Sequence, residues 1–223
     1  MSTDRRDFLG TLMAAGLAAP SAGALSRPRP AATAEPLPQS PWDVSWTSKL
    51  TGSKRVVFDS PEISMGLAPL RVLVWHKDYA DVYGTTPSDM SGVLVLRHNA
   101  IWMIMNDEFW DHHGVGKITG INDPKTGKPI RRNPYTGPTI HADLPAAVAD
   151  NVLQKAMALV PVLACNLAFQ DVVEVVKAEA GGDAARARAM AIRHIVPGVT
   201  LQPSGVFAVT RACEGGCTYF LAS

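Results

Sequence analysis

Residues 93–99 read Val-Leu-Val-Leu-Arg-His-Asn. The first four of these residues are all apolar, which is typical of a strand buried on both faces of a parallel sheet. The polar group that follows, Arg97 to Asn99, marks the end of the strand, where a connection to a helix is expected. The sequence holds four further short runs of this kind: 55–58, 160–163, 199–201 and 217–221.

Helical patterns separate these runs. We expect helices over 67–83, from Asn99 to Gly114, and over 170–180, 184–194 and 204–213. Alternating strands and helices are characteristic of a parallel sheet that is covered by helices on both faces. The sequence therefore predicts a single α/β domain, a three-layer sandwich with a mostly parallel five-stranded sheet.

The composition is that of an ordinary globular domain. Of the 223 residues, 47% are apolar, and 21 Lys and Arg balance 20 Asp and Glu to give a formal charge of +1. Such a charge provides no field that would attract a nucleic acid or an anionic membrane, so neither is expected as a partner. Three cysteines are too few for a disulfide-rich scaffold.

The N-terminal segment has the features of an export signal. Residues 1–24 hold the pair Arg5-Arg6, an apolar run from Leu12 to Ala19, and small residues before a cleavage point after Ala24, which together resemble a twin-arginine signal peptide. Residues 25–41 contain five prolines and are expected to form an extended linker, so the folded domain would span 42–223. We expect a periplasmic or otherwise extracytoplasmic protein, exported folded, whose mature chain has no integral membrane segment.

The candidate catalytic residues follow the strands. Asp59 comes after the first run, His98 after the second, and Cys165 and Asn166 after the third. Because ligands of open α/β sheets bind beyond the carboxyl ends of the strands, these four side chains are expected to share a site. A thiol that faces a helix N-terminus is poised for nucleophilic chemistry, and a nearby histidine can hold or move its proton. Taken singly, Cys165 also fits a small core residue, Asp59 a helix cap, and His98 a capping or core histidine.

Cys213 and Cys217 form a second thiol feature. Their three-residue spacer differs from the Cys-x-x-Cys of thioredoxin-like sites. A tight turn at Gly215-Gly216 would bring the sulfurs within disulfide range, whereas a helical Cys213 and a strand-bound Cys217 need not meet. A structural bridge, a redox-active pair and two unpaired thiols all remain open.

Metal and cofactor signals are weaker. His112 and His113 are adjacent on the expected helix, so we expect them to cap its end and not to face one ion. Trp102 and Met105, beside His98, could line a haem or copper pocket, although such spacing is more typical of a core. The Pro- and Gly-rich stretch 116–143 is expected to be mostly a solvated loop, with a lid or an oligomer contact as the alternatives.

Three short motifs resemble the DsrE/DsrF-like family of sulfur-relay proteins: Val162-Leu163-Ala164-Cys165-Asn166, Pro203-Ser204-Gly205-Val206, and Gly216-Cys217-Thr218-Tyr219. The resemblance implies a flavodoxin-like fold, a persulfide on Cys165, assembly into homotrimers or hexamers, and a sulfur-donor or redox protein as partner. Family members are typically cytoplasmic, so this chain resembles an exported branch. Cys213 and Cys217 stand where the closing family motif usually carries other residues.

Two functions follow as hypotheses. In the first, Cys165 relays sulfur as a persulfide or performs thiol redox chemistry, His98 moves its proton, Asp59 and Asn166 orient the site, and Cys213 with Cys217 form a bridge or a resolving pair. In the second, a non-enzymatic protein binds haem, a metal or a small hydrophobic ligand at His98, Trp102 and Met105. A structural subunit of an exported complex is a third, less specific possibility.

Overall fold

A computed structural model describes residues 41–223. The expected signal peptide and all but the last residue of the expected linker lie outside the described residues. Within residues 41–223, no helix combines the length and the apolar character that crossing a membrane requires.

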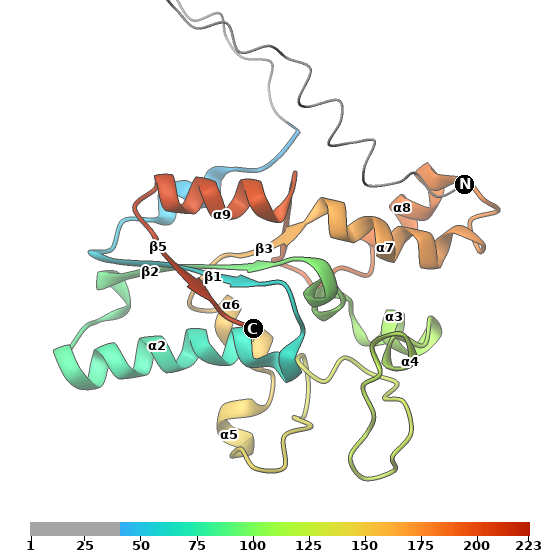
Figure 1. The fold of residues 1–223 in the computed structure, drawn as a ribbon, viewed down its shortest axis with the longest axis horizontal. Coiled ribbons are helices and arrows are strands. Elements are labelled where there is room, and N and C mark those ends of the chain that lie inside the picture. The colour runs from blue at the N-terminus through green and yellow to red at the C-terminus, as the bar shows by residue number, and fades with distance from the viewer. Residues whose placement is uncertain (1–40) are drawn as a thin grey trace, which may run out of the picture. The chain divides into compact units, whose positions relative to one another are not determined.

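A five-stranded parallel sheet forms the centre of the domain (Figure 1). Its strands are β1 (Lys54–Ser60), β2 (Met90–Leu96), β3 (Val162–Cys165), β4 (Thr200–Gln202) and β5 (Thr218–Leu221). They lie in the order β4-β3-β2-β1-β5, and every neighbouring pair is parallel. β2 is buried at all seven residues, as its continuous apolar run predicts.

Helices cover both faces of the sheet, which confirms the single-domain, flavodoxin-like three-layer sandwich. Figure 1 shows α9 (Gly205–Glu214) above the sheet, and α2 (Leu67–Tyr83) and α6 (Val152–Met157) beneath it. Because side chains alternate along a strand, β2 serves both layers: Val93 and Val95 pack with the α9 layer, and Leu94 and Leu96 pack with the α2 layer. The 3₁₀ helix η1 (Ser45–Lys49) adds Trp46 to the α9 layer.

The remaining elements lie in the connections between strands. α7 (Asn166–Lys177) and α8 (Ala184–Ile192) pack against each other between β3 and β4. Short elements complete the set: η2 (Ser64–Gly66), η3 (Pro87–Asp89), η4 (His98–Ile104), α3 (Asp107–His112), α4 (Val115–Thr119) and α5 (Ala146–Ala149).

The prediction of one helix from Asn99 to Gly114 was wrong, because this span forms two separate helices, η4 and α3. The break lies at Met105, which is extended and forms an isolated antiparallel bridge with Ile195. Asn106 then begins α3, with its side-chain oxygen accepting the backbone N–H of Phe109 at 2.9 Å. A contact with a segment ninety residues later in the sequence thus overrides the local helical pattern.

The 116–143 stretch is also more ordered than a solvated loop. Asn133 is fully buried, and its side-chain amide donates to the carbonyl oxygens of Met103 and Met105 at 2.8 and 2.7 Å. Tyr135 is buried against Trp110, with ring centroids 6.4 Å apart. These contacts fix the middle of the stretch to the core, while its basic residues Lys125 and Lys128 stay exposed.

Candidate functional site

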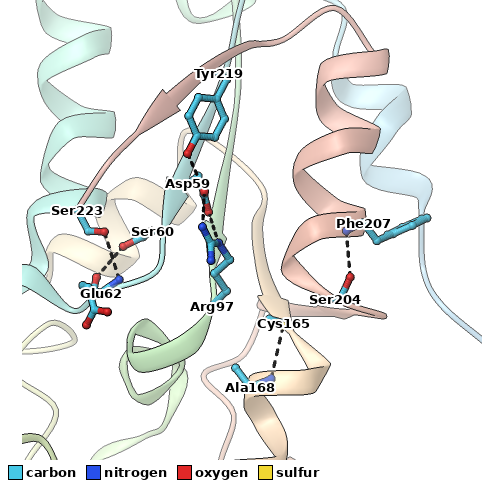
Figure 2. A network of polar contacts seen from close by, with 10 residues as sticks. All are labelled: Asp59, Ser60, Glu62, Arg97, Cys165, Ala168, Ser204, Phe207, Tyr219 and Ser223. Atoms are coloured by element: carbon cyan, nitrogen blue, oxygen red, sulfur yellow. Dashed lines mark hydrogen bonds and ion pairs between the residues drawn. The ribbon is translucent and has the colours of Figure 1, made fainter. Parts of the chain in front are cut away.

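Several polar side chains lie at the carboxyl edge of the parallel sheet, and Figure 2 shows their hydrogen bonds. Asp59 lies near the end of β1, Arg97 directly follows β2, and Cys165 ends β3. Ser204 follows β4 by two residues and begins α9. Asp59 and Cys165 thus both lie at this edge, on β1 and β3, with β2 between the two strands.

A buried ion pair forms the centre of this site. Arg97 donates from Nε to Oδ1 of Asp59 at 2.7 Å and from Nη2 to Oδ2 at 2.9 Å. Asp59 is 3% exposed, and its Oδ2 also accepts the hydroxyl of Tyr219 at 3.0 Å. Asp59 is therefore not a helix cap. Its carboxylate joins β1, β2 and β5 through one set of hydrogen bonds.

The electrostatics follow from these contacts. The hydrogen bond to Asp59 raises the pKa of the Arg97 guanidinium, so the side chain is charged at any physiological pH. Desolvation, together with the hydrogen bond to Asp59, raises the pKa of the Tyr219 phenol, which keeps that group protonated. Cys165 lies within electrostatic reach of Arg97. The charged residue near the thiol is thus Arg97, and not His98 as the sequence suggested.

Cys165 is the N-cap residue of α7. Its Sγ accepts the backbone N–H of Ala168 at 3.5 Å, and the residue is 6% exposed. The N-terminus of a helix carries a partial positive charge, which favours an anion at this position. Next to the thiol, the amide Oδ1 of Asn166 is buried and has no hydrogen-bond partner among the described residues.

The N-terminus of α9 closes the site on its other side. Ser204 caps this helix by accepting the N–H of Phe207 at 3.0 Å (Figure 2). Gly205 lies directly against the Arg97 side chain, and a Cβ added to Gly205 would stand 2.6 Å from Cδ of Arg97. Because Gly205 has no side chain, the Arg97 side chain has room to extend toward Asp59.

His98 does not join this cluster. Its side chain is exposed, its φ is +46°, and within residues 41–223 it makes no hydrogen bond or ion pair. Met105 is fully buried in the core, and Trp102 is 7% exposed. Trp102 lines a cavity of about 700 Å³ together with Glu62, Asn99 and Asp171, but neither His98 nor Met105 lines it. The three residues expected to bind a ligand are thus not gathered around one space.

Cys213 and Cys217 are free thiols. Cys213 lies exposed in α9, whereas Cys217 is buried beneath that helix, before β5. Burial raises the pKa of the Cys217 thiol to about 11. Cys213 lies nine residues beyond Ser204, about 14 Å along the helix at 1.5 Å per residue. The structure therefore shows no bridge between Cys213 and Cys217, and a redox-active pair stays a prediction.

The adjacent histidines differ from the expectation. His112 is the last residue of α3 and His113 is its C-cap, with φ −96° and ψ 3°. The two imidazole rings lie edge to face, with centroids 4.6 Å apart. Nitrogen atoms of both rings and a carboxylate oxygen of Glu179 all lie within 4.8 Å of one another. The inference that the two histidines cannot face one ion was therefore wrong.

Sequence reasoning missed Arg97 and Tyr219. For Arg97 a signal was present, since it directly follows the apolar run of β2, at the same edge as Asp59. Tyr219 gave no comparable signal, because a tyrosine in a strand is common and only the β1–β5 pairing brings it to Asp59.

Comparisons with known proteins do not place the chain in a family. No family model matches it. No curated protein matches it either. A solved structure of a protein of unknown function from Methanobacterium thermoautotrophicum is similar at a TM-score of 0.38 and 14% identity, covering 75% of this chain and 98% of that one. Membership of the DsrE/DsrF-like family therefore stays a prediction.

Proposed function

We propose that the chain is an exported, DsrE-like protein that carries sulfur as a persulfide on Cys165, or exchanges thiols and disulfides there. The observation that supports this most directly is the position of Cys165. Its thiol caps α7 at the carboxyl edge of the sheet, within electrostatic reach of Arg97. Helix N-termini and fixed cations are places where proteins hold anionic groups, which suits the anionic sulfur of a persulfide or thiolate intermediate.

The proposed step is a sulfane-sulfur transfer. The Cys165 thiolate attacks the outer sulfur of a donor persulfide, R–S–SH. A new S–S bond forms on Cys165, the donor S–S bond breaks, and the donor leaves as the thiolate R–S⁻. No net oxidation occurs, so the step needs a donor persulfide and no additional oxidant.

The neighbouring residues receive roles from their contacts. Arg97 supplies the positive charge beside the thiol, and Asp59 with Tyr219 holds Arg97 in place. The unpartnered Oδ1 of Asn166 offers an acceptor for the S–H of the loaded persulfide. His98 is exposed, and among the residues that the structure describes it makes no contact that supports the proton relay first assigned to it. Because Cys165 is 6% exposed, loading requires local movement at the start of α7.

Sulfur loading tests this proposal. The chain is incubated with a small-molecule persulfide, quenched with an alkylating agent, and measured by intact mass and peptide mapping. We expect one added sulfur on Cys165 that a reductant removes, and we expect the Cys165→Ser variant to lose it. Cys213→Ser is the matched control, because Cys213 is the exposed thiol that a donor can modify without a site. Loading that persists in Cys165→Ser but disappears in Cys213→Ser would refute the proposal.

A second function has one observation in its favour. The cavity of about 700 Å³ beside Trp102 is large enough for a small organic ligand, and apolar residues such as Ile118 and Ile140 line it together with polar ones. Native mass spectrometry of protein purified from its own cell would reveal a bound non-covalent mass. Trp102→Ala should lower its occupancy, whereas Cys165→Ser should not.

We further propose that the chain is exported by the twin-arginine route and assembles with copies of itself. Support for assembly comes from β5, which forms one edge of the sheet and exposes Tyr219, Phe220 and Leu221 by 44% to 50%. An exposed apolar edge strand is a common place for a second chain to pair. Export is tested by replacing Arg5 and Arg6 with Lys and following the location of the protein.

A further inference from the structure

Three side chains with metal-binding atoms meet at the ends of α3 and α7, away from the Asp59–Arg97 pair. Nε2 of His112 lies 3.1 Å from Oε1 of Glu179, and Nε2 of His113 lies 3.9 Å from Oε2 of the same carboxylate. We propose that His112, His113 and Glu179 bind one divalent transition-metal ion of the Zn²⁺ type.

The distances suit such an ion. Tetrahedral Zn²⁺ with bonds of about 2.0 to 2.1 Å to nitrogen or oxygen separates its ligand atoms by about 3.3 Å. The separations of 3.1 and 3.9 Å, which run to the two different oxygens of Glu179, lie on either side of that value. One ligand atom from each of the three residues lies within 4.8 Å of the other two, so side-chain rotations are enough to gather them around one ion. Imidazole nitrogens favour Zn²⁺ and its neighbours over Mg²⁺ or Ca²⁺, which prefer oxygen ligands.

The surroundings hold one of the three proposed ligands, His113, in place. The ring of Phe109 packs against His113, with centroids 4.4 Å apart, and against His194, with centroids 5.7 Å apart. The backbone N–H of Asn106 donates to the carbonyl oxygen of His194 at 2.8 Å, which ties the start of α3 to the segment after α8. His113 is therefore packed into the domain, while the side chains of His112 and Glu179 are 61% and 46% exposed.

A fourth coordination position faces a small cavity. The cavity, of about 160 Å³, is lined by the three ligands and also by Glu108, Met190 and His194. Nδ1 of His194 is buried and makes no hydrogen bond to any residue of 41–223, and Oε2 of Glu108 lies 3.6 Å from it. Two histidines and one glutamate with an open position is an arrangement that Zn²⁺ takes in proteins, where water occupies the fourth position.

Co²⁺ and Zn²⁺ titrations test the site on the untagged full chain after chelator treatment, because a polyhistidine tag would itself bind metal. We expect one equivalent of Co²⁺ to give the visible bands of tetrahedral coordination, and Zn²⁺ to displace it. His113→Ala and Glu179→Gln should each weaken Zn²⁺ binding at least tenfold. The control His98→Asn removes an exposed histidine outside the cluster and suits the positive φ at that position, so it should bind normally.

A second readout separates lost binding from lost folding. A ligand that binds only the folded state raises the melting temperature, by about 5 to 10 °C at a hundredfold excess over Kd for a domain of this size. Wild type and His98→Asn should show this rise and Glu179→Gln should not, while all three melt alike without metal. Absence of saturable binding, equal affinity in the variants, or a thiolate-to-cobalt charge-transfer band pointing to the cysteines would each overturn the proposal.

Discussion

The guanidinium of Arg97 binds both carboxylate oxygens of Asp59, at 2.7 and 2.9 Å, where the ends of β1 and β2 meet. The two residues face each other because β1 and β2 are parallel and in register, with Ser60 opposite Leu96. The Asp59 side chain is 4% exposed and that of Arg97 is 24% exposed, so little water screens the pair. A buried pair of this kind is costly to break, since the remaining charge stays buried without a partner.

Arg97→Ala should therefore destabilise the domain by about 3 to 5 kcal/mol, the usual cost of leaving one partner of a buried pair uncompensated. Chemical denaturation of wild type, Arg97→Ala, Asp59→Ala and the double variant measures the coupling. We expect the double variant to lose less stability than the sum of the two single variants. Additive losses would mean that the two side chains do not interact energetically.

Gly205→Ala should weaken the same pair without touching either charge. A Cβ at this position would stand 2.6 Å from Cδ and 2.9 Å from Cβ of Arg97, so the arginine must move. Overpacking of this kind costs about 1 to 3 kcal/mol. The control is Val206→Ala at the next position of the same helix, which is 71% exposed and changes helix propensity without crowding Arg97. If Gly205→Ala is as stable as wild type in denaturation, then Arg97 has more room than the structure shows.

Cys213 and Cys217 should react at very different rates with a thiol reagent at pH 8. Cys213 is exposed and should react first. Cys217 is buried with a pKa of about 11, so only about one thiol in a thousand is deprotonated at this pH, and it should react only after unfolding. Cys213→Ser should remove the fast phase. A Cys217 that is labelled as fast as Cys213 in the folded protein would contradict its burial.

The sequence predicted the layers of the fold because its strands and helices carry local patterns. The apolar positions of 67–83 predicted α2 at the bounds that the structure has, and the continuous run before Arg97 predicted β2. The helix over 99–114 failed because Met105 pairs with Ile195, a contact that no local pattern encodes. Local patterns were thus enough to predict α2 and β2, whereas the break between η4 and α3 depends on a contact distant in the sequence.

The candidate site was predictable only in part, for the same reason. Asp59 and Cys165 could be placed because each lies at the end of a predicted strand, and the ends of parallel strands share an edge. The Asp59–Arg97 and Asp59–Tyr219 contacts depend on strand order, which the sequence did not specify. The close approach of the His112 and His113 rings occurs where α3 ends. The sequence could not predict it, because the exact end of a helix is poorly determined by a residue pattern.

A final prediction concerns β5, whose outer edge has no partner strand within the described residues. Phe220 is 44% exposed there and stacks edge-on with Phe58, at a centroid distance of 5.8 Å. If copies of the chain associate through this edge, Phe220→Glu should reduce the molar mass measured by light scattering to that of one chain. Val206→Glu places the same charge on an exposed apolar residue of α9 and should leave the mass unchanged. Circular dichroism must show both variants folded, because Phe220 also packs against the core. A wild-type protein that is monomeric at all concentrations, or a folded Phe220→Glu variant of unchanged mass, would rule out assembly through β5.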